Sequence, residues 1–80
     1  MNNVRGLHTH AMACHDQSRR YERDGEIGLA LEYMREAADN EQAALDATPK
    51  GAEPTTTILR DSVAAMRAQV ERLQRKEPTP

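Results

Sequence analysis

Apolar residues recur at helical spacing between two backbone breaks in the middle of the chain. The stretch from Asp24 to Ala47 begins with an Asp-Gly pair and ends before Thr48-Pro49. Its apolar residues are Ile27, Ala30, Leu31, Met34, Ala37, Ala38, Ala44 and Leu45. Steps of three and four residues place such side chains on one face of an α-helix and fit no strand period. A helix with one apolar face must bury it, so we expect the rest of the chain to supply partners for it.

Two further segments have the spacing of helices that pack along a seam. The inward positions of the first are Leu7, Ala11, Cys14, Ser18 and Tyr21, and those of the last are Leu59, Val63, Met66, Val70 and Leu73. This four-three-four-three spacing is typical of nearly antiparallel helices. The sequence therefore predicts one all-α domain over residues 1–80, with an up-down-up arrangement. We expect helices at about 7–24, 26–47 and 56–76, a loop at 48–55, and flexible ends at 1–6 and 77–80.

Glycine and proline mark the connections between these helices. Gly25 can supply the left-handed residue that closes a helix, which predicts a tight hairpin between the first two helices. Pro49 and Pro54 stop helix propagation in the second connection, and Gly51 permits a turn there. Gly28, in the first turn of the second helix, indicates either a close approach to the first helix or a frayed turn.

The composition predicts a thin core and a soluble protein in a reducing compartment. The chain contains no Trp or Phe, so its core must come from Ala, Leu, Met, Val and Ile. Such a core supports a monomer only if one helix contact is very regular; otherwise a second copy or a partner adds to it. Cys14 is the single cysteine, which excludes an intrachain disulfide and fits the cytoplasm. No apolar run suggests a signal peptide or a membrane span.

Charge is distributed unevenly although the formal net charge is only −2. The second helix is acidic and contains Arg35 as its one base, whereas the third is rich in arginine. We expect these two helices to pair, with each exposed ion pair contributing about 0–1 kcal/mol. The bases Arg19, Arg20 and Arg23 lack the aromatic residues of a nucleic-acid platform, so nucleic-acid binding is not expected.

The histidine and cysteine residues of the first helix are the candidates for metal ligands. His10 and Cys14 share a face at i,i+4 spacing, but His8 and His15 share a different face. The four cannot converge on one ion, so we interpret Cys14 as a core residue and predict no metal site and no cofactor. A metal-dependent regulator that uses Cys14 remains an alternative, and whether these residues bind a metal stays open.

No pattern of catalytic residues is present either. The serines and threonines lack a base held beside them, there is no glycine-rich phosphate loop, and carboxylate pairs on the second helix lack a desolvating pocket. The sequence therefore predicts a protein that is not an enzyme.

The segment from Cys14 to Ala37 resembles one tetratricopeptide repeat. Tyr21, Gly25, Ala30, Met34 and Ala37 match the aromatic, turn-glycine, small, large and small positions of that repeat, and Ser18 matches the small position of its first helix. With AEPTTTIL opening the next helix, about half the chain looks like short bacterial tetratricopeptide-like proteins. Cys14 in place of the usual Trp, Gln42 in place of Pro, and Glu71 in place of a second turn glycine depart from the pattern.

The resemblance implies a helical hairpin that binds another protein. In such a repeat the ligand-facing side of the first helix is formed here by Met12, His15, Arg19 and Glu22. We therefore predict a small, non-catalytic adaptor or regulatory protein, with self-association through the third helix as a linked expectation, hence a homo-oligomer. The alternative is a phage-type or defence-type inhibitor whose acidic second helix occupies a basic groove of a larger enzyme or nucleic-acid-binding complex.

Overall fold

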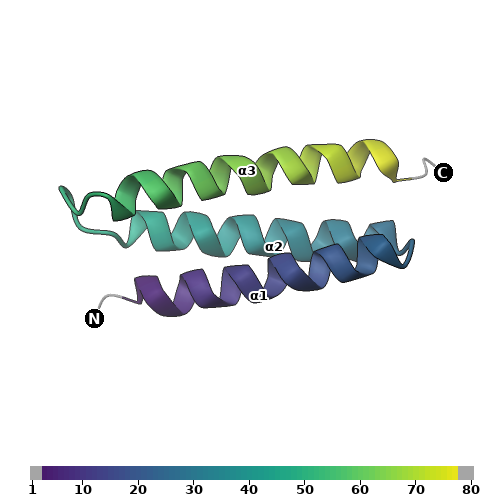
Figure 1. Cartoon of the computed structure of the whole chain (residues 1–80), viewed down its shortest axis with the longest axis horizontal. Coiled ribbons are helices and arrows are strands. Elements are labelled where there is room, and N and C mark those ends of the chain that lie inside the picture. Colours follow the sequence, from purple (N-terminus) through teal and green to yellow (C-terminus); the bar gives the residue numbers. More distant parts are fainter. Residues whose placement is uncertain (1–2, 78–80) are drawn as a thin grey trace.

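Three α-helices form nearly the whole structure. The computed structural model describes residues 3–77 and gives α1 Val4–Arg23, α2 Ile27–Asp46 and α3 Thr55–Lys76, with no strand in that range. Figure 1 shows α2 lying between α1 and α3, with consecutive helices running in opposite directions. The molecule is elongated, measuring 45 × 18 × 18 Å. The predicted all-α, up-down-up arrangement is confirmed.

The helix boundaries differ most at the start of α1. It begins at Val4, so residues 4–6 of the predicted flexible end are helical. The Asn3 carbonyl accepts a hydrogen bond from the Leu7 amide at 3.0 Å, and only Gly6, which costs about 1 kcal/mol relative to alanine, disfavours a helix there. The end of α3 is at Lys76 as predicted, and the remaining helix boundaries differ from the predictions by one residue. Glu77 follows α3 and bonds through its amide to the Leu73 carbonyl, and the remaining residues of the two predicted flexible ends lie outside 3–77.

Gly25 closes α1 as the sequence predicts. Its φ of 81° lies in the left-handed region that favours glycine. The Gly25 amide donates to the Glu22 carbonyl at 3.0 Å, and the Glu26 amide donates to the Tyr21 carbonyl at 2.8 Å. These two bonds form a Schellman motif, which satisfies carbonyls at the end of α1 and lets α2 begin at once.

Gly28 does not mark a close approach to α1. Of the neighbouring atoms, only the Glu77 carboxylate at the end of α3 would touch a Cβ at this position, at the ordinary distance of 3.5 Å. The interpretation of close packing on the first helix is therefore wrong. Position 28 faces the end of α3, and a side chain fits there.

The core follows the two predicted seams and is rich in alanine. Its buried apolar residues are Ala11, Cys14, Ala30, Leu31, Met34, Ala37, Ala38, Ala44, Leu59, Val63, Met66 and Leu73. Small side chains let α1 and α2 approach closely over most of their length. Three predicted seam residues, Leu7, Tyr21 and Val70, are only half-buried. The Tyr21 ring stacks on Tyr33 of α2 with centroids 5.4 Å apart.

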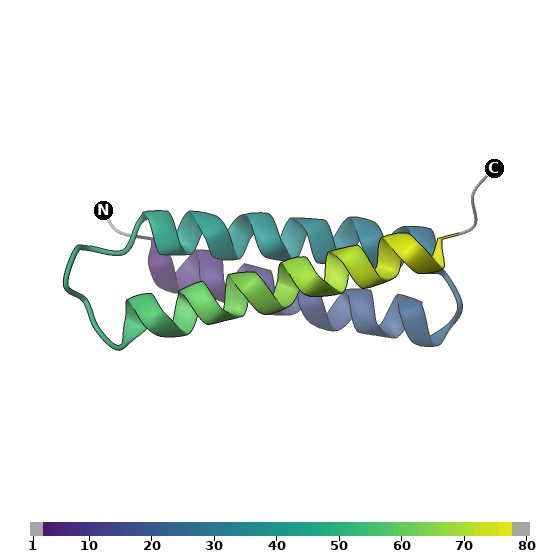
Figure 2. The same ribbon diagram turned by 90° about the horizontal axis from the view of Figure 1, so that it is seen from above.

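The first and third helices both pack on α2 but contact each other little. In Figure 2, seen from above, α3 is inclined to α2 along its length. Because α1 and α3 are both antiparallel to α2, they run parallel to each other. No helix within residues 3–77 is long and apolar enough to span a membrane.

Candidate functional site

A groove lies between α1 and α3, with α2 as its floor. Its volume is about 570 Å³. The α1 side is lined by Met12, His15, Arg19 and Glu22, the floor by Met34, and the α3 side by Ser62, Ala65, Met66, Gln69 and Arg72. All four residues predicted to bind a partner therefore line one groove. Their spacing of three, four and three residues places them in one row on α1.

Methionines form the apolar part of this groove. Met34 and Met66 are buried, at 2% and 3% exposed, and face it from α2 and α3. Met12 on the α1 side is 37% exposed. The methionine side chain is unbranched and polarisable, so it adapts to apolar groups of different shapes. This part of the groove can accommodate an apolar side chain of a ligand.

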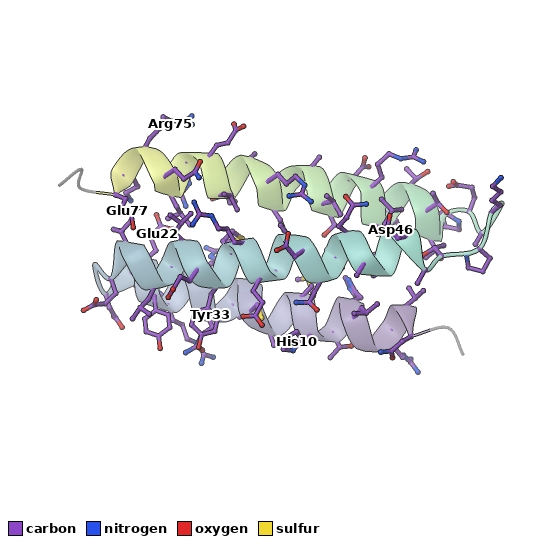
Figure 3. All side chains as sticks on the ribbon, turned by 180° about the vertical axis from the view of Figure 1, so that it is seen from behind. His10, Glu22, Tyr33, Asp46, Arg75 and Glu77 are labelled. Atoms are coloured by element: carbon purple, nitrogen blue, oxygen red, sulfur yellow. The ribbon has the colours of Figure 1, made fainter. Side chains whose placement is uncertain are left out.

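One end of the groove is closed by an ion-pair cluster that joins α1 to α3. The two Nη atoms of Arg72 donate to the two carboxylate oxygens of Glu22 at 2.6 and 2.7 Å, and the Lys76 Nζ donates to the same carboxylate at 2.9 Å. Hydrogen bonds from Arg72 and Lys76 lower the pKa of Glu22 to about 2. Figure 3 shows Glu22 beside the C-terminal part of α3.

This cluster corrects the predicted pairing of charged helices. Arginine and lysine side chains of α3 pair with Glu22 of α1, and no ion pair joins α2 to α3 within residues 3–77. Arg72 and Lys76 lie in the last turns of α3, next to the last turn of α1, because the two helices run parallel. Glu41 of α2 instead accepts a hydrogen bond from the Ser62 hydroxyl of α3.

Arg19 supplies the uncompensated charge of the groove. Its side chain is exposed and has no ion-pair partner in the part of the chain that the structure describes. Glu22, one turn further on, is already neutralised by two bases. His15 is half-buried, and its Nδ1 atom lies 3.7 Å from the Asp16 carboxylate with no hydrogen-bond partner among residues 3–77. The middle of the groove is therefore electropositive.

Glu41 forms a buried polar network that the sequence analysis missed. Its carboxylate is fully buried, and its oxygens lie 2.8 and 3.0 Å from Nδ1 of His8 on α1. The Ser62 hydroxyl of α3 donates to the same carboxylate at 2.5 Å. The acidic composition of the second helix gives no indication that one of its carboxylates is buried. The apolar series on that helix passes directly from Ala38 to Ala44, and that gap was the available signal.

The histidines and the cysteine of α1 separate into different environments. His8 contacts Glu41, and His15 lies beside Asp16. His10 lies 3.7 Å from the Cys14 sulfur and 3.4 Å from the Glu36 carboxylate of α2. His8 and His15 lie apart from His10 and Cys14, as predicted. Glu36 of α2, however, lies beside His10 and Cys14.

No protein-family model, curated protein or solved structure matches this chain. The likeness to tetratricopeptide repeats stays a prediction. Function is therefore inferred from the geometry of the groove.

Proposed function

We propose that this protein is a small non-catalytic interaction module that binds a peptide segment of another protein in the groove between α1 and α3. The observation that carries the proposal is a groove in which buried methionines of α2 and α3 lie beside a row of polar residues on α1, with Arg19 exposed among them. Ligand sites are commonly concave, with an apolar lining and a few directed polar groups, and range from about 300 to 1,000 Å³. The resemblance to a tetratricopeptide repeat supports the same side of α1 as the binding face.

The chemistry of the groove indicates a peptide with one apolar and one acidic residue. An apolar side chain of the peptide would rest on Met34 and Met66. A carboxylate would pair with Arg19, because the nearby Glu22 is held by Arg72 and Lys76 and does not compete for it. Ile58, which is 59% exposed and precedes Ser62 by one turn of α3, offers a further apolar contact outside the residues that line the groove.

The polar groups near the groove do not support a catalytic role. Ser62 and His8 both bond to the carboxylate of Glu41. In nucleophilic catalysis by serine, an imidazole must accept the hydroxyl proton, and the carboxylate must lie behind the imidazole. Here the hydroxyl donates directly to the carboxylate, which supports a structural role for the network.

The proposal is tested by selecting peptides from a random display library on the full chain. We expect the selected peptides to share an acidic residue near an apolar one. Their affinity for the Arg19→Glu variant should fall about tenfold or more, because an attractive contact becomes repulsive. Met12→Asp should also weaken binding, since it places a charge on the apolar rim.

Arg20→Glu is the matched control for this experiment. It makes the same charge change on the next residue of α1, which is exposed but does not line the groove. Isothermal titration of one selected peptide against the variants gives the affinities. Equal losses for Arg19→Glu and Arg20→Glu, or selected peptides without a shared acid, would place binding elsewhere on the molecule.

A second candidate function uses the acidic surface of α2. Glu32, Glu36 and Asp39 are exposed on this helix, although Arg35 interrupts them and Glu41 is withdrawn into the core. An inhibitor acting through this surface would bind a basic groove of a larger protein, and its affinity would fall steeply with salt. In that case Glu32→Gln with Asp39→Asn would weaken partner binding and Arg19→Glu would not.

A further inference from the structure

Three potential metal ligands meet on the side of α1 that faces α2. His10 Nε2 lies 3.4 Å from a Glu36 carboxylate oxygen and 3.7 Å from Cys14 Sγ. All three ligand atoms lie within 4.8 Å of one another, and no other group of three or more such ligands occurs within residues 3–77. In Figure 3, His10 lies along α1, away from Glu22 at the closed end of the groove.

We propose that His10, Cys14 and Glu36 bind one divalent transition-metal ion, with Zn²⁺ as the ion that suits this ligand set best. Zinc is coordinated by histidine nitrogen at about 2.0–2.1 Å, by carboxylate oxygen at about 2.0–2.2 Å and by thiolate sulfur at about 2.3 Å. In a tetrahedral site those bond lengths place nitrogen about 3.6 Å from sulfur and about 3.3 Å from oxygen. The observed separations are within about 0.1 Å of both values.

The third ligand is visible only in the folded hairpin. The i,i+4 spacing of His10 and Cys14 places both on one face of α1, and the antiparallel packing of α2 brings Glu36 to the same place. A Glu36 oxygen and the Cys14 sulfur lie within 4.8 Å of each other, and in a tetrahedral zinc site they would be about 3.6 Å apart. The sequence contains four candidate ligands on one helix, whereas in the structure three candidate ligands from two helices lie together.

The surroundings of the ligands leave the fourth coordination position open. The side chains of His10 and Glu36 are about half exposed, at 56% and 53%, while Cys14 is 5% exposed. An ion bound here would contact water or an external donor on its outer side, as in zinc sites with three protein ligands. This site is separate from the groove, whose α1 residues point to the other side of the helix.

Binding at this site releases a proton. The Cys14 thiol loses its proton to solvent as the sulfur–metal bond forms, so the neutral thiol becomes a negatively charged thiolate. Affinity should therefore increase as pH rises, and each bound ion should release about one proton from Cys14.

The test is a Co²⁺ titration of the reduced, metal-free full chain, followed by displacement with Zn²⁺. We expect one ion per chain and a thiolate-to-cobalt charge-transfer band, both reversed by zinc. The band should disappear in Cys14→Ser, and affinity should fall more than tenfold in His10→Ala and in Glu36→Gln, since each removes a ligand. Circular dichroism of each variant verifies that the helices are intact.

Two matched variants distinguish a built site from adventitious binding. His15→Ala removes another histidine of α1, and Glu32→Gln removes the exposed acid one turn before Glu36. Both variants should bind Co²⁺ with the affinity of the wild type. Absence of the charge-transfer band at saturating Co²⁺, or equal weakening by His10→Ala and His15→Ala, would overturn the proposal. Failure of the peptide selection would leave this result unaffected, because the two sites share no residue.

Discussion

Glu41, in the middle of α2, bonds to both outer helices. A buried carboxylate is costly unless its oxygens are hydrogen-bonded, and here His8 and Ser62 provide the partners. A shift of either outer helix by one residue would break one of these bonds. The network therefore fixes the alignment of α1 and α3 on α2, which is also the alignment that forms the groove.

The contribution of this network can be measured with a double-mutant cycle. Ser62→Ala removes one donor from a buried carboxylate and should lower the free energy of unfolding by about 1.5–3 kcal/mol. In a Glu41→Met background the same change should have little effect, because the carboxylate is gone. Urea denaturation of the four proteins provides the comparison. Equal effects of Ser62→Ala in both backgrounds would show that Ser62 does not act through Glu41.

Glu22 should make stability depend on pH in the acid range. Its pKa falls from 4.5 in the unfolded chain to about 2 in the folded one, chiefly through hydrogen bonds from Arg72 and Lys76. A lowered folded pKa means that the contribution is complete above about pH 4.5 and is lost as pH falls toward about 2. Glu22→Gln should therefore be less stable than wild type near pH 7 and equally stable near pH 2.

The comparison for Glu22 requires an acid without such partners. Glu32 is exposed and forms no ion pair within residues 3–77, so Glu32→Gln should leave the pH profile of the wild type unchanged. Thermal unfolding followed by circular dichroism between about pH 2 and pH 7 gives the profiles. A constant difference between Glu22→Gln and wild type over this range would contradict the assigned ion pair.

At the scale of elements, the α1–α2 hairpin depends on one glycine and tolerates the loss of another. Gly25 has a φ of 81°, whereas Gly28 is helical. No atom lies within 4 Å of a Cβ built at Gly25, so only its backbone conformation opposes a side chain there. At Gly28 a Cβ would make one ordinary contact, with Glu77.

Alanine substitution should therefore have opposite effects at these two positions. Gly25→Ala should destabilise the protein by about 1–2 kcal/mol, because alanine is strained in the left-handed region. Gly28→Ala should stabilise it by about 0.5–1 kcal/mol, because alanine loses less backbone entropy in a helix. Urea unfolding measures both. Destabilisation by Gly28→Ala would mean that the start of α2 packs more tightly than the structure shows.

At the scale of the whole molecule, α2 is the central element and the outer helices depend on it. The end of α3 nevertheless ties the outer helices to each other, because Arg72 and Lys76 bond to Glu22 of α1. Leu73 is fully buried between these two residues. The last turns of α3 thus combine apolar burial with the contact that closes the groove.

Shortening α3 should test this arrangement. A chain that ends at Glu71 lacks Leu73 and both partners of Glu22, and it should lose about 3 kcal/mol or more of stability. A chain that ends at Glu77 retains these contacts and should unfold like the full protein. Thermal unfolding gives the melting temperatures of the two shortened chains. Equal melting temperatures would show that the end of α3 adds nothing to the fold.

The sequence by itself determined the number of helices, their alternating direction, the closure of α1 at Gly25 and most of the core. These features follow from periodicity and backbone preference, which act over a few residues. Helical spacing also places Met12, His15, Arg19 and Glu22 in one row on α1, whereas their choice as a binding face came from the resemblance to a tetratricopeptide repeat.

Tertiary structure decided which residues from different helices meet. The burial of Glu41 between His8 and Ser62, the pairing of Glu22 with α3 and the meeting of Glu36 with His10 and Cys14 all depend on how the helices are aligned. Helical spacing assigns a residue to a face of its own helix, but it does not specify which residue of the neighbouring helix lies opposite. This alignment is set by packing of the whole core together with the buried polar network, so no local sequence pattern predicts it.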